Sequence, residues 1–240
     1  KVLVDGLFNQ PYGVPNYRVR GHLADLDVPL GFWRSVGASH NGFYHECFVD
    51  ELAQAAGADP LAFRMDATYD EWEPAWRVLE AVRDMSGWTG ETPEGTGRGV
   101  AMVYSFGTPV AMVIEVQDDG GAIRMTRAWI AADPGVALDP GNIEAQLVGG
   151  MVYGLSAAIG EEITFADGVV QQKNFPDYEP LRMAQMPRVE TRILEVQERL
   201  GGIGEVGTPP AAPALANAIF DLTGERVREL PLRKRFDFVI

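Results

Sequence analysis

The chain has 240 residues, a length that suits one large domain or two small ones. Its net charge is −14, from 34 acidic and 20 basic residues, and a field of that sign argues against nucleic-acid binding because it repels phosphate groups. No apolar run approaches the ~20 residues that a membrane-spanning helix needs. The single cysteine, Cys47, excludes an intramolecular disulfide and a cysteine-ligated iron–sulfur cluster within this chain.

The first part of the chain predicts extended segments followed by a helix. Residues 1–40 lack periodicity, and we expect a loop at 31–40. A helix is expected from about Asn41 to Ala56, because Gly57 is a natural C-terminal glycine. Its predicted apolar stripe consists of Phe43, Cys47, Phe48, Leu52 and Ala55. Cys47 is therefore expected to be a small buried side chain.

A second helical region is predicted after residue 58. Asp59 and Pro60 have the pattern of an N-cap and a first helical residue. Apolar residues then recur at helical spacing up to Gly87, and we expect the tryptophans among them in the core; these residues are Trp72, Trp76, Leu79 and Val82. Residues 88–97 are dense in glycine, proline and threonine, which predicts a linker.

The remainder of the chain alternates strand and helix patterns. Strands are predicted at 99–106, 110–117 and 122–132, the last two joined by a turn at 118–121. A long helix after Asp139, a hairpin of 162–165 with 169–172, a strand near 189–196 and a helix from about 210 to 222 follow. This order predicts an α+β fold, with mixed sheets and packed helices, rather than a doubly wound sheet.

The glycine-rich loop at 200–210 is the first candidate for chemistry. Its glycines at 201, 202, 204 and 207 leave Glu205 on a segment with little Cβ obstruction, so that a bulky cofactor can approach. The helix predicted after it directs its N-terminal amides toward the acid and favours the ionised carboxylate that a general base requires. The alternative is a solvent-exposed glutamate in a turn, which spacing alone favours.

Two further segments combine polar residues with accessible backbone. The helix after Asp139 is interrupted by Gln146, three glycines and Tyr153, which predicts that something packs closely against it, and helix–sheet packing is the simplest partner. Its core stripe is Ile143, Leu147, Met151, Leu155 and Ala158. The loop at 31–39 places Arg34 beside aromatic residues, where it either binds an anion or extends along the surface. No histidine has zinc-site spacing, and we assign no metal ligand.

Three motifs resemble one family of enzymes. They are GFWRSVGASHNGFYHECFVDELAQAAGADPLAFR, the stretch from AADPGVALDPGNIEAQLVGG to RMAQMP, and GGIGEVGTPPAAPALANAIFDLTGERVRELPL. In this order they resemble the molybdopterin-cytosine-dinucleotide subunits of the isoquinoline oxidoreductase and membrane-linked aldehyde dehydrogenase group, within the xanthine oxidase family. The similarity runs through nearly all of residues 31–232. It implies that the chain is the C-terminal part of a molybdopterin-binding large subunit.

The resemblance also implies roles for single residues. Glu205 matches the glutamate beside the molybdenum in the family's Gly-x-Gly-Glu motif, and is expected to be the catalytic base. Gln146 looks like the glutamine that hydrogen-bonds the pterin. The remaining expected cofactor-binding residues are Arg34, Gly37, Ala38 and Gly204, and those expected on the substrate approach are Phe32 and Trp33. The segment around Asn174, Asp177 and Tyr178 is expected near the substrate channel.

By the same resemblance, the enzyme oxidises an aldehyde or N-heterocycle with water as the oxygen source. Electrons pass to [2Fe-2S] clusters on a small partner subunit, and the cofactor is shared with an upstream portion of the large subunit, because the family's Gly-Gly-Gly-Phe-Gly and Gln-Gly loops do not occur here. Residues 1–97 are expected to form a segment with the cofactor-approach loop and helices, and 98–240 an α+β domain with the catalytic glutamate.

Other interpretations remain open at this point. The chain can be a non-catalytic assembly fragment or a paralogue of such a subunit. A carboxylate-dependent hydrolase is disfavoured because no second acid is linked by motif to Glu205. The family resemblance implies a periplasmic or membrane-associated enzyme, and a cytoplasmic location stays open.

Overall fold

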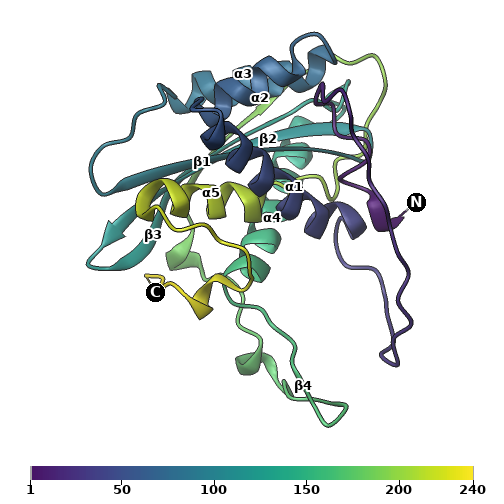
Figure 1. Ribbon diagram of the computed structural model, residues 1–240, viewed down its shortest axis with the longest axis vertical. Helices are drawn as coiled ribbons and strands as arrows, with labels where there is room; N and C mark the ends of the chain where they lie inside the picture. The colour runs from purple at the N-terminus through teal and green to yellow at the C-terminus, as the bar shows by residue number, and fades with distance from the viewer. Residues whose placement is uncertain (1, 240) are drawn as a thin grey trace.

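The computed structural model describes residues 2–239, which form a four-stranded sheet with helices on both faces (Figure 1). The sheet order is β1-β2-β3-β6, in which the first three strands are antiparallel and β6 runs parallel to β3. The strands are β1 (Thr96–Ser105), β2 (Thr108–Asp119), β3 (Ala122–Ala132) and β6 (Arg188–Ile193). This mixed sheet with packed helices confirms the predicted α+β class.

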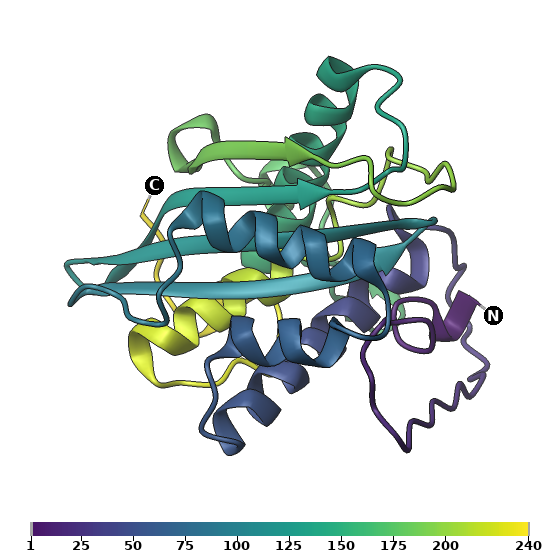
Figure 2. The ribbon, with the colours of Figure 1, turned by 90° about the horizontal axis from the view of Figure 1, so that it is seen from above.

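Five α-helices surround the sheet. They are α1 (Val36–Ala55), α2 (Pro60–Thr68), α3 (Glu73–Ser86), α4 (Pro140–Ile159) and α5 (Ala211–Thr223). Figures 1 and 2 show α3 lying across one face of the sheet with α2 beside it, whereas α4 and α5 lie on the other face. Helix α1 packs along α5 and the edge strand β1. No helix within residues 2–239 combines the length and apolar character needed to cross a membrane.

The strands are apolar on both faces because helices cover both. In β1, Val100 and Met102 belong to the core on the α3 side, and Ala101 between them belongs to the core on the α5 side. This alternation follows from the two-residue period of a strand. The sheet is therefore a buried layer between two helical layers.

Two glycines in β1 allow α5 to approach the sheet closely. A Cβ added to Gly99 would lie 2.1 Å from the backbone nitrogen of Ala218, and one added to Gly97 would lie 2.3 Å from the Ala218 carbonyl oxygen. No side chain fits at those distances, so only glycine permits this contact. Helix α5 is thus seated directly on the backbone of β1.

Most of the predicted elements are found with small changes in their ends. The strand predicted at 122–132 has those bounds, and α4 begins at Pro140 with the predicted apolar stripe buried (Ile143, Leu147, Met151, Leu155 and Ala158). The hairpin predicted at 162–172 is shorter, because only β4 (Phe165–Ala166) and β5 (Val169–Val170) pair. The division of the chain at residues 97 and 98 stays a prediction.

Two predictions about α1 are wrong. The helix begins at Val36 rather than near Asn41, so half of the loop expected at 31–40 is helical. The predicted stripe is also incorrect, since Phe48 and Leu52 are exposed, although Cys47 is buried as expected. The inward face of α1 instead carries Glu46 and Asp50, and these acids can be buried because arginines from other elements pair with them.

Two segments stand away from the body of the protein. The strap, residues 21–33, is exposed along its whole length and precedes α1. The arm, residues 161–183, carries β4 and β5 and protrudes at the bottom of Figure 1. Short 3-10 turns at 2–4, 175–177, 183–185 and 232–234 complete the described structure.

Candidate functional site

Glu205 lies in the loop between β6 and α5, where the end of the strap reaches it. Its carboxylate oxygen Oε1 accepts a hydrogen bond from the Ser35 amide at 2.8 Å. Its backbone carbonyl accepts two more, from the Ser35 hydroxyl at 2.5 Å and from the Thr208 amide at 3.1 Å. Glu205 is partly exposed, so the carboxylate is fixed at one oxygen and still accessible.

Arg34 connects the same loop to helix α4. Its Nη2 atom donates to the Gln146 Oε1 at 3.0 Å and to the Gly204 carbonyl at 2.6 Å. The guanidinium carbon lies 5.6 Å from the centre of the Tyr153 ring, within the range of a cation–π contact. The structure therefore brings together Arg34, Gln146, Gly204 and Glu205, which come from three distant parts of the sequence.

Phe32 and Trp33 lie at the end of the strap. The Trp33 ring is 4.8 Å from the Tyr153 ring, whereas the Phe32 side chain is 86% exposed. Both residues line a cavity of about 850 Å³, whose walls come mainly from the strap, α1, α4 and the start of α5. Their assignment to a substrate approach stays a prediction, and the cavity provides room for it.

Gly37 and Ala38 have a different local structure from the one expected. Both are buried in the first turn of α1, and are not part of an open loop. Ala38 packs against Gly6, where an added Cβ would lie 2.6 Å from the Ala38 Cα. The Ala38 amide already donates to the Ser35 carbonyl at 3.0 Å, so a contact of this helix N-terminus with a cofactor would be made by the Gly37 amide. Their cofactor-binding role stays a prediction.

The glycines of the Glu205 loop serve packing more than access. A Cβ on Gly201 would lie 2.1 Å from Thr108 Oγ1, and one on Gly207 would lie 2.4 Å from the Leu147 carbonyl oxygen. Only Gly204 has no atom within 4 Å of its Cβ position. The expectation that all four glycines leave room for a cofactor is therefore wrong, except at Gly204.

The sequence predicts that something packs closely against the glycines of α4. In the structure the Glu205 loop, rather than the sheet, makes this contact. An added Cβ would lie 3.0 Å from the Gly207 Cα at Gly150 and 2.7 Å from the Thr208 carbonyl oxygen at Gly154. These glycines let the loop lie directly on the helix. As a result α4 supports the segment that carries Glu205.

The arm residues expected near a substrate channel do not contact Glu205. Asn174 and Asp177 cap the short turn at 175–177. Burial, followed by the negative charge of Glu161, raises the pKa of Tyr178 to about 12. Burial also raises the pKa of Glu161 above its usual value. These residues hold the arm in shape, and their nearness to substrate stays a prediction.

Sequence reasoning missed Ser35 as a contact of Glu205. The residue stands next to Arg34 in the motif, but a serine with a left-handed backbone has no signature in a sequence. Tyr153 was noted only as an interruption of the apolar pattern of α4, whereas its ring contacts both Arg34 and Trp33. Position in the motif beside Arg34 was the one available signal for Ser35.

Comparison with known proteins identifies the family. Isoquinoline 1-oxidoreductase subunit beta of Brevundimonas diminuta is 33% identical over 227 residues, which cover 92% of this chain and 29% of that protein. The membrane-bound aldehyde dehydrogenase (pyrroloquinoline-quinone) of Gluconacetobacter polyoxogenes is 30% identical, over 92% of this chain and 32% of its own length. The family profile described as molybdopterin cofactor-binding domain matches residues 37–187. This chain belongs to the molybdopterin-binding subunits of the xanthine oxidase family.

Solved structures share the fold of this molybdopterin-binding chain. The aldehyde oxidoreductase from Desulfovibrio desulfuricans has a TM-score of 0.72 at 14% identity, over 83% of this chain and 40% of that one. Quinoline 2-oxidoreductase from Pseudomonas putida has a TM-score of 0.69 at 12% identity, over 82% and 50%. The chain spans about a third of the length of the two curated relatives, 29% and 32%.

The residues around Glu205 fit the cofactor that this family binds. A Cβ placed on Gly149 or Gly204 meets no atom within 4 Å, so the backbone of α4 and of the loop faces open space. Gln146 and Gly149 are one helical turn apart and lie on the same side of α4. The cationic Arg34 and the Gln146 amide suit a polar, anionic ligand. Among residues 2–239, no three His, Cys, Asp or Glu side chains gather as a metal site would need.

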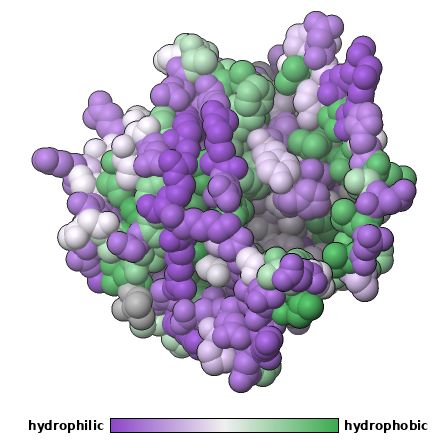
Figure 3. Space-filling view, turned by 60° about the horizontal axis from the view of Figure 1, so that its bottom comes forward, coloured by the Kyte–Doolittle hydropathy of each residue, from purple (hydrophilic) through white to green (hydrophobic). Residues whose placement is uncertain are grey.

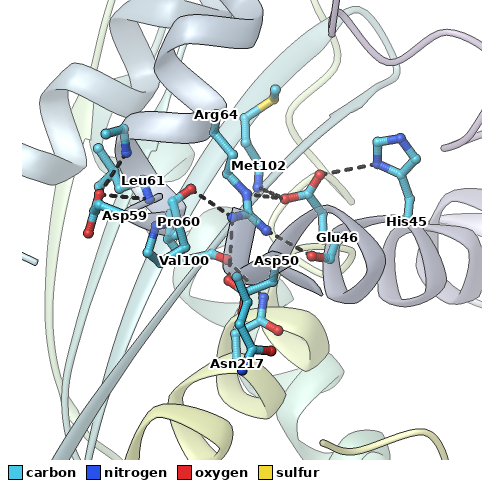
Figure 4. A network of polar contacts seen from close by, with 12 residues as sticks. His45, Glu46, Asp50, Asp59, Pro60, Leu61, Arg64, Val100, Met102 and Asn217 are labelled. Carbon is cyan, nitrogen blue, oxygen red and sulfur yellow. Dashed lines mark hydrogen bonds and ion pairs between the residues drawn. The ribbon is translucent and has the colours of Figure 1, made fainter. Parts of the chain in front are cut away.

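A separate polar cluster stabilises the molybdopterin-binding domain away from this site (Figure 4). Glu46 and Arg64 are fully buried, and Arg64 Nε lies 2.8 Å from Glu46 Oε2, which also accepts the Met102 amide. Burial alone would raise the pKa of Glu46, but the charge of Arg64, helped by hydrogen bonds, lowers it to about 2. Tyr12 donates to the same carboxylate at 3.0 Å and so attaches the N-terminal segment.

Proposed function

We propose that this chain is the C-terminal part of the large subunit of a molybdenum hydroxylase, with Glu205 as its catalytic base. The proposed reaction is the oxidation of an aldehyde or N-heterocycle with water as the oxygen source. One observation carries the proposal: Arg34, Gln146 and Glu205, which match three separate motifs of the family, meet in one partly open site.

The geometry suits Glu205 to proton transfer. Among the described residues, hydrogen bonds to the Glu205 side chain involve Oε1 alone, which the Ser35 amide holds at 2.8 Å. Oε2 is therefore the atom that accepts the proton released when a water-derived oxygen attacks the substrate carbon. When bound, the molybdenum cofactor accepts the two electrons of the oxidation. The protein contributes the base, its orientation and the pocket.

Arg34 and Gln146 are proposed to hold the cofactor, as a molybdopterin cytosine dinucleotide. Arg34 uses Nη2 for its contacts with Gln146 and Gly204, so its remaining N–H groups can bind an anionic oxygen. The Gln146 Oε1 accepts from Arg34, which orients the amide so that its nitrogen can donate to a pterin ring. The hydrogen bond from Arg34 to the Gly204 carbonyl links these two side chains to the residue that precedes Glu205.

The cavity beside the site suits a small apolar substrate. Its volume of about 850 Å³ lies within the range of small-molecule sites, and aromatic residues line it, among them Phe32, Trp33 and Phe43. Walls that are mostly apolar accept an aromatic heterocycle or an aliphatic aldehyde, and the polar residues of the lining include His40, Arg228 and Glu229.

An upstream portion of the large subunit is proposed to cover this face. Apolar side chains on the strap and the arm are strongly exposed, among them Leu23, Phe32, Phe175 and Met183. Figure 3 brings this side of the molecule forward and shows a hollow whose rim carries both hydrophobic and hydrophilic residues. Exposed apolar surface of this extent marks an interface. The matched region covers only 29% and 32% of the two curated relatives, and the rest of such a subunit is the proposed partner of this surface.

The same resemblance supports two further proposals about the assembly. Electrons are proposed to leave through [2Fe-2S] clusters on a small partner subunit. A periplasmic or membrane-associated location is proposed, supported by the name of the membrane-bound aldehyde dehydrogenase to which the chain is similar, with the cytoplasm as the alternative. Fractionation of the source cells and identification of the subunits that copurify with this chain would test both.

Purification of the intact complex tests the central proposal. We expect about one molybdenum per large subunit and reduction of an artificial acceptor with at least one member of a panel of aldehydes and azaarenes. The control is the same complex purified from cells grown with tungstate, which should lack turnover. A complex with no molybdenum and no turnover on the panel would favour the alternative, an assembly fragment without catalysis.

A further inference from the structure

The backbone that enters α1 is unusual directly beside Glu205. Ser35 and Val36 lie in the left-handed region, with φ of +68° and +48°. This conformation is uncommon for residues other than glycine, and it is strained for a β-branched residue such as valine. Strain of this kind persists only where the surrounding structure holds it in place. The contacts of Ser35 show what holds it here.

Ser35 contacts Glu205 at two points. Its amide donates to the carboxylate oxygen Oε1 at 2.8 Å, and its hydroxyl donates to the backbone carbonyl of Glu205 at 2.5 Å. Ser35 is only 1% exposed, so water competes poorly for these bonds. One residue therefore restrains both the side chain and the main chain of Glu205.

We propose that Ser35 is a positioning residue, whose left-handed backbone and hydroxyl together hold the Glu205 carboxylate in the orientation that accepts the proton. This inference rests on the proposed role of Glu205 as the base. Ser35 acts only through Glu205 and needs no contact with substrate or cofactor. Because the direction of an amide follows the backbone conformation, the positive φ aims the Ser35 N–H at Oε1.

The Ser35→Gly variant distinguishes a role of Ser35 in positioning Glu205 from a role in forming the turn alone. Glycine keeps the amide and adopts a positive φ more easily than serine, so a residue needed only for the turn would be replaced without loss. If the hydroxyl positions Glu205, kcat per bound molybdenum falls roughly 5- to 10-fold, the loss expected from one buried hydrogen bond. KM and the melting temperature stay near their wild-type values. Ser35→Ala should lower kcat by a similar factor.

Ser86→Ala is the matched control. Ser86 is also buried, and its hydroxyl donates to the backbone carbonyl of Val82 at 2.6 Å, but it lies on α3, on the opposite face of the sheet from α4. The same substitution there removes the same kind of bond, and kcat should stay within about 2-fold of wild type. A kcat of Ser35→Gly within 2-fold of wild type would overturn the proposal.

A crystal structure of the Ser35→Gly complex provides a readout that does not depend on turnover. We expect the Glu205 side chain in more than one conformer, against a single one in the wild type. A single conformer in the wild-type position would also overturn the proposal. If Glu205→Gln kept full activity, the proposed function would fail, while the conformers of Glu205 would still report whether Ser35 orients it.

Discussion

Glu205→Gln is the substitution that tests the proposed base most directly. Glutamine has the size of glutamate, and its carbonyl oxygen can still accept the Ser35 amide that lies 2.8 Å from Oε1. It cannot take up a proton in the way the carboxylate does. A positioned general base contributes about 10²–10⁴-fold to rate, which corresponds to roughly 3–5 kcal/mol of activation free energy. We expect kcat to fall by that factor.

Cofactor content should stay near wild type in this variant. The contacts of Arg34 are made with Gln146 and the Gly204 carbonyl, and they do not involve the Glu205 side chain. The assay is the initial rate with an artificial acceptor, divided by the molybdenum in the same sample. Glu198→Gln, an exposed acid earlier in the loop, is the control and should change neither quantity. Full molybdenum with kcat within 3-fold of wild type would refute the base role.

One further prediction concerns the cofactor contact and two concern the separate polar cluster around Glu46. Gln146→Ala should leave less molybdenum after dialysis, since it removes a hydrogen-bonding amide worth ~1 kcal/mol; unchanged occupancy would contradict the assignment. Arg64→Met should lower the free energy of unfolding by about 3–5 kcal/mol in urea titrations, because it leaves Glu46 buried without its arginine while Asp50 keeps Arg226, whereas the exposed Arg77→Met should have little effect. Because the pKa of Glu46 is lowered from 4.5 to about 2, its stabilisation is complete above pH 4.5 and lost as pH falls toward 2. Urea midpoints should drop over that range, and less steeply in Glu46→Gln.

Elements with local signals were predicted well. Helix α4 begins at Pro140, where Asp139 caps the Asn142 amide at 3.1 Å, and its apolar period is regular. The turn between β2 and β3 uses Gly120 and Gly121, both with positive φ. In each case the residues that decide the structure are neighbours in the sequence, so pattern alone suffices.

Features that depend on distant partners were not predicted. The inward face of α1 carries Glu46 and Asp50 because Arg64 and Arg226 arrive from α2 and from the segment after α5. Without these arginines the acids would belong at the surface, and the exposed Phe48 would belong in the core. A prediction from helical hydrophobicity places charged residues on the exposed face, because it does not include ion pairs with residues of other elements.

The candidate site shows the same division. Motifs identified Glu205, Arg34 and Gln146 one at a time, but nothing in the sequence stated that Arg34 would bridge the other two segments. The pattern of glycines predicts open space at 201 and 207, whereas tight packing against β2 and α4 requires these two glycines. Contacts of this kind depend on how the loop is placed on α4, which only the folded chain shows.

The close seating of α5 on Gly97 and Gly99 has a consequence for how the site can move. The loop that carries Glu205 starts from β6, which pairs with β3 in the sheet, and ends in α5, which packs directly on that sheet. Arg34 instead arrives at the end of the exposed strap, which lies outside these elements. Displacement of the strap would therefore release the cofactor side of the site and the Ser35 contact while the anchors of the Glu205 loop stayed fixed. The proposed base is therefore attached to the sheet and α5, whereas Arg34 is attached to an exposed segment.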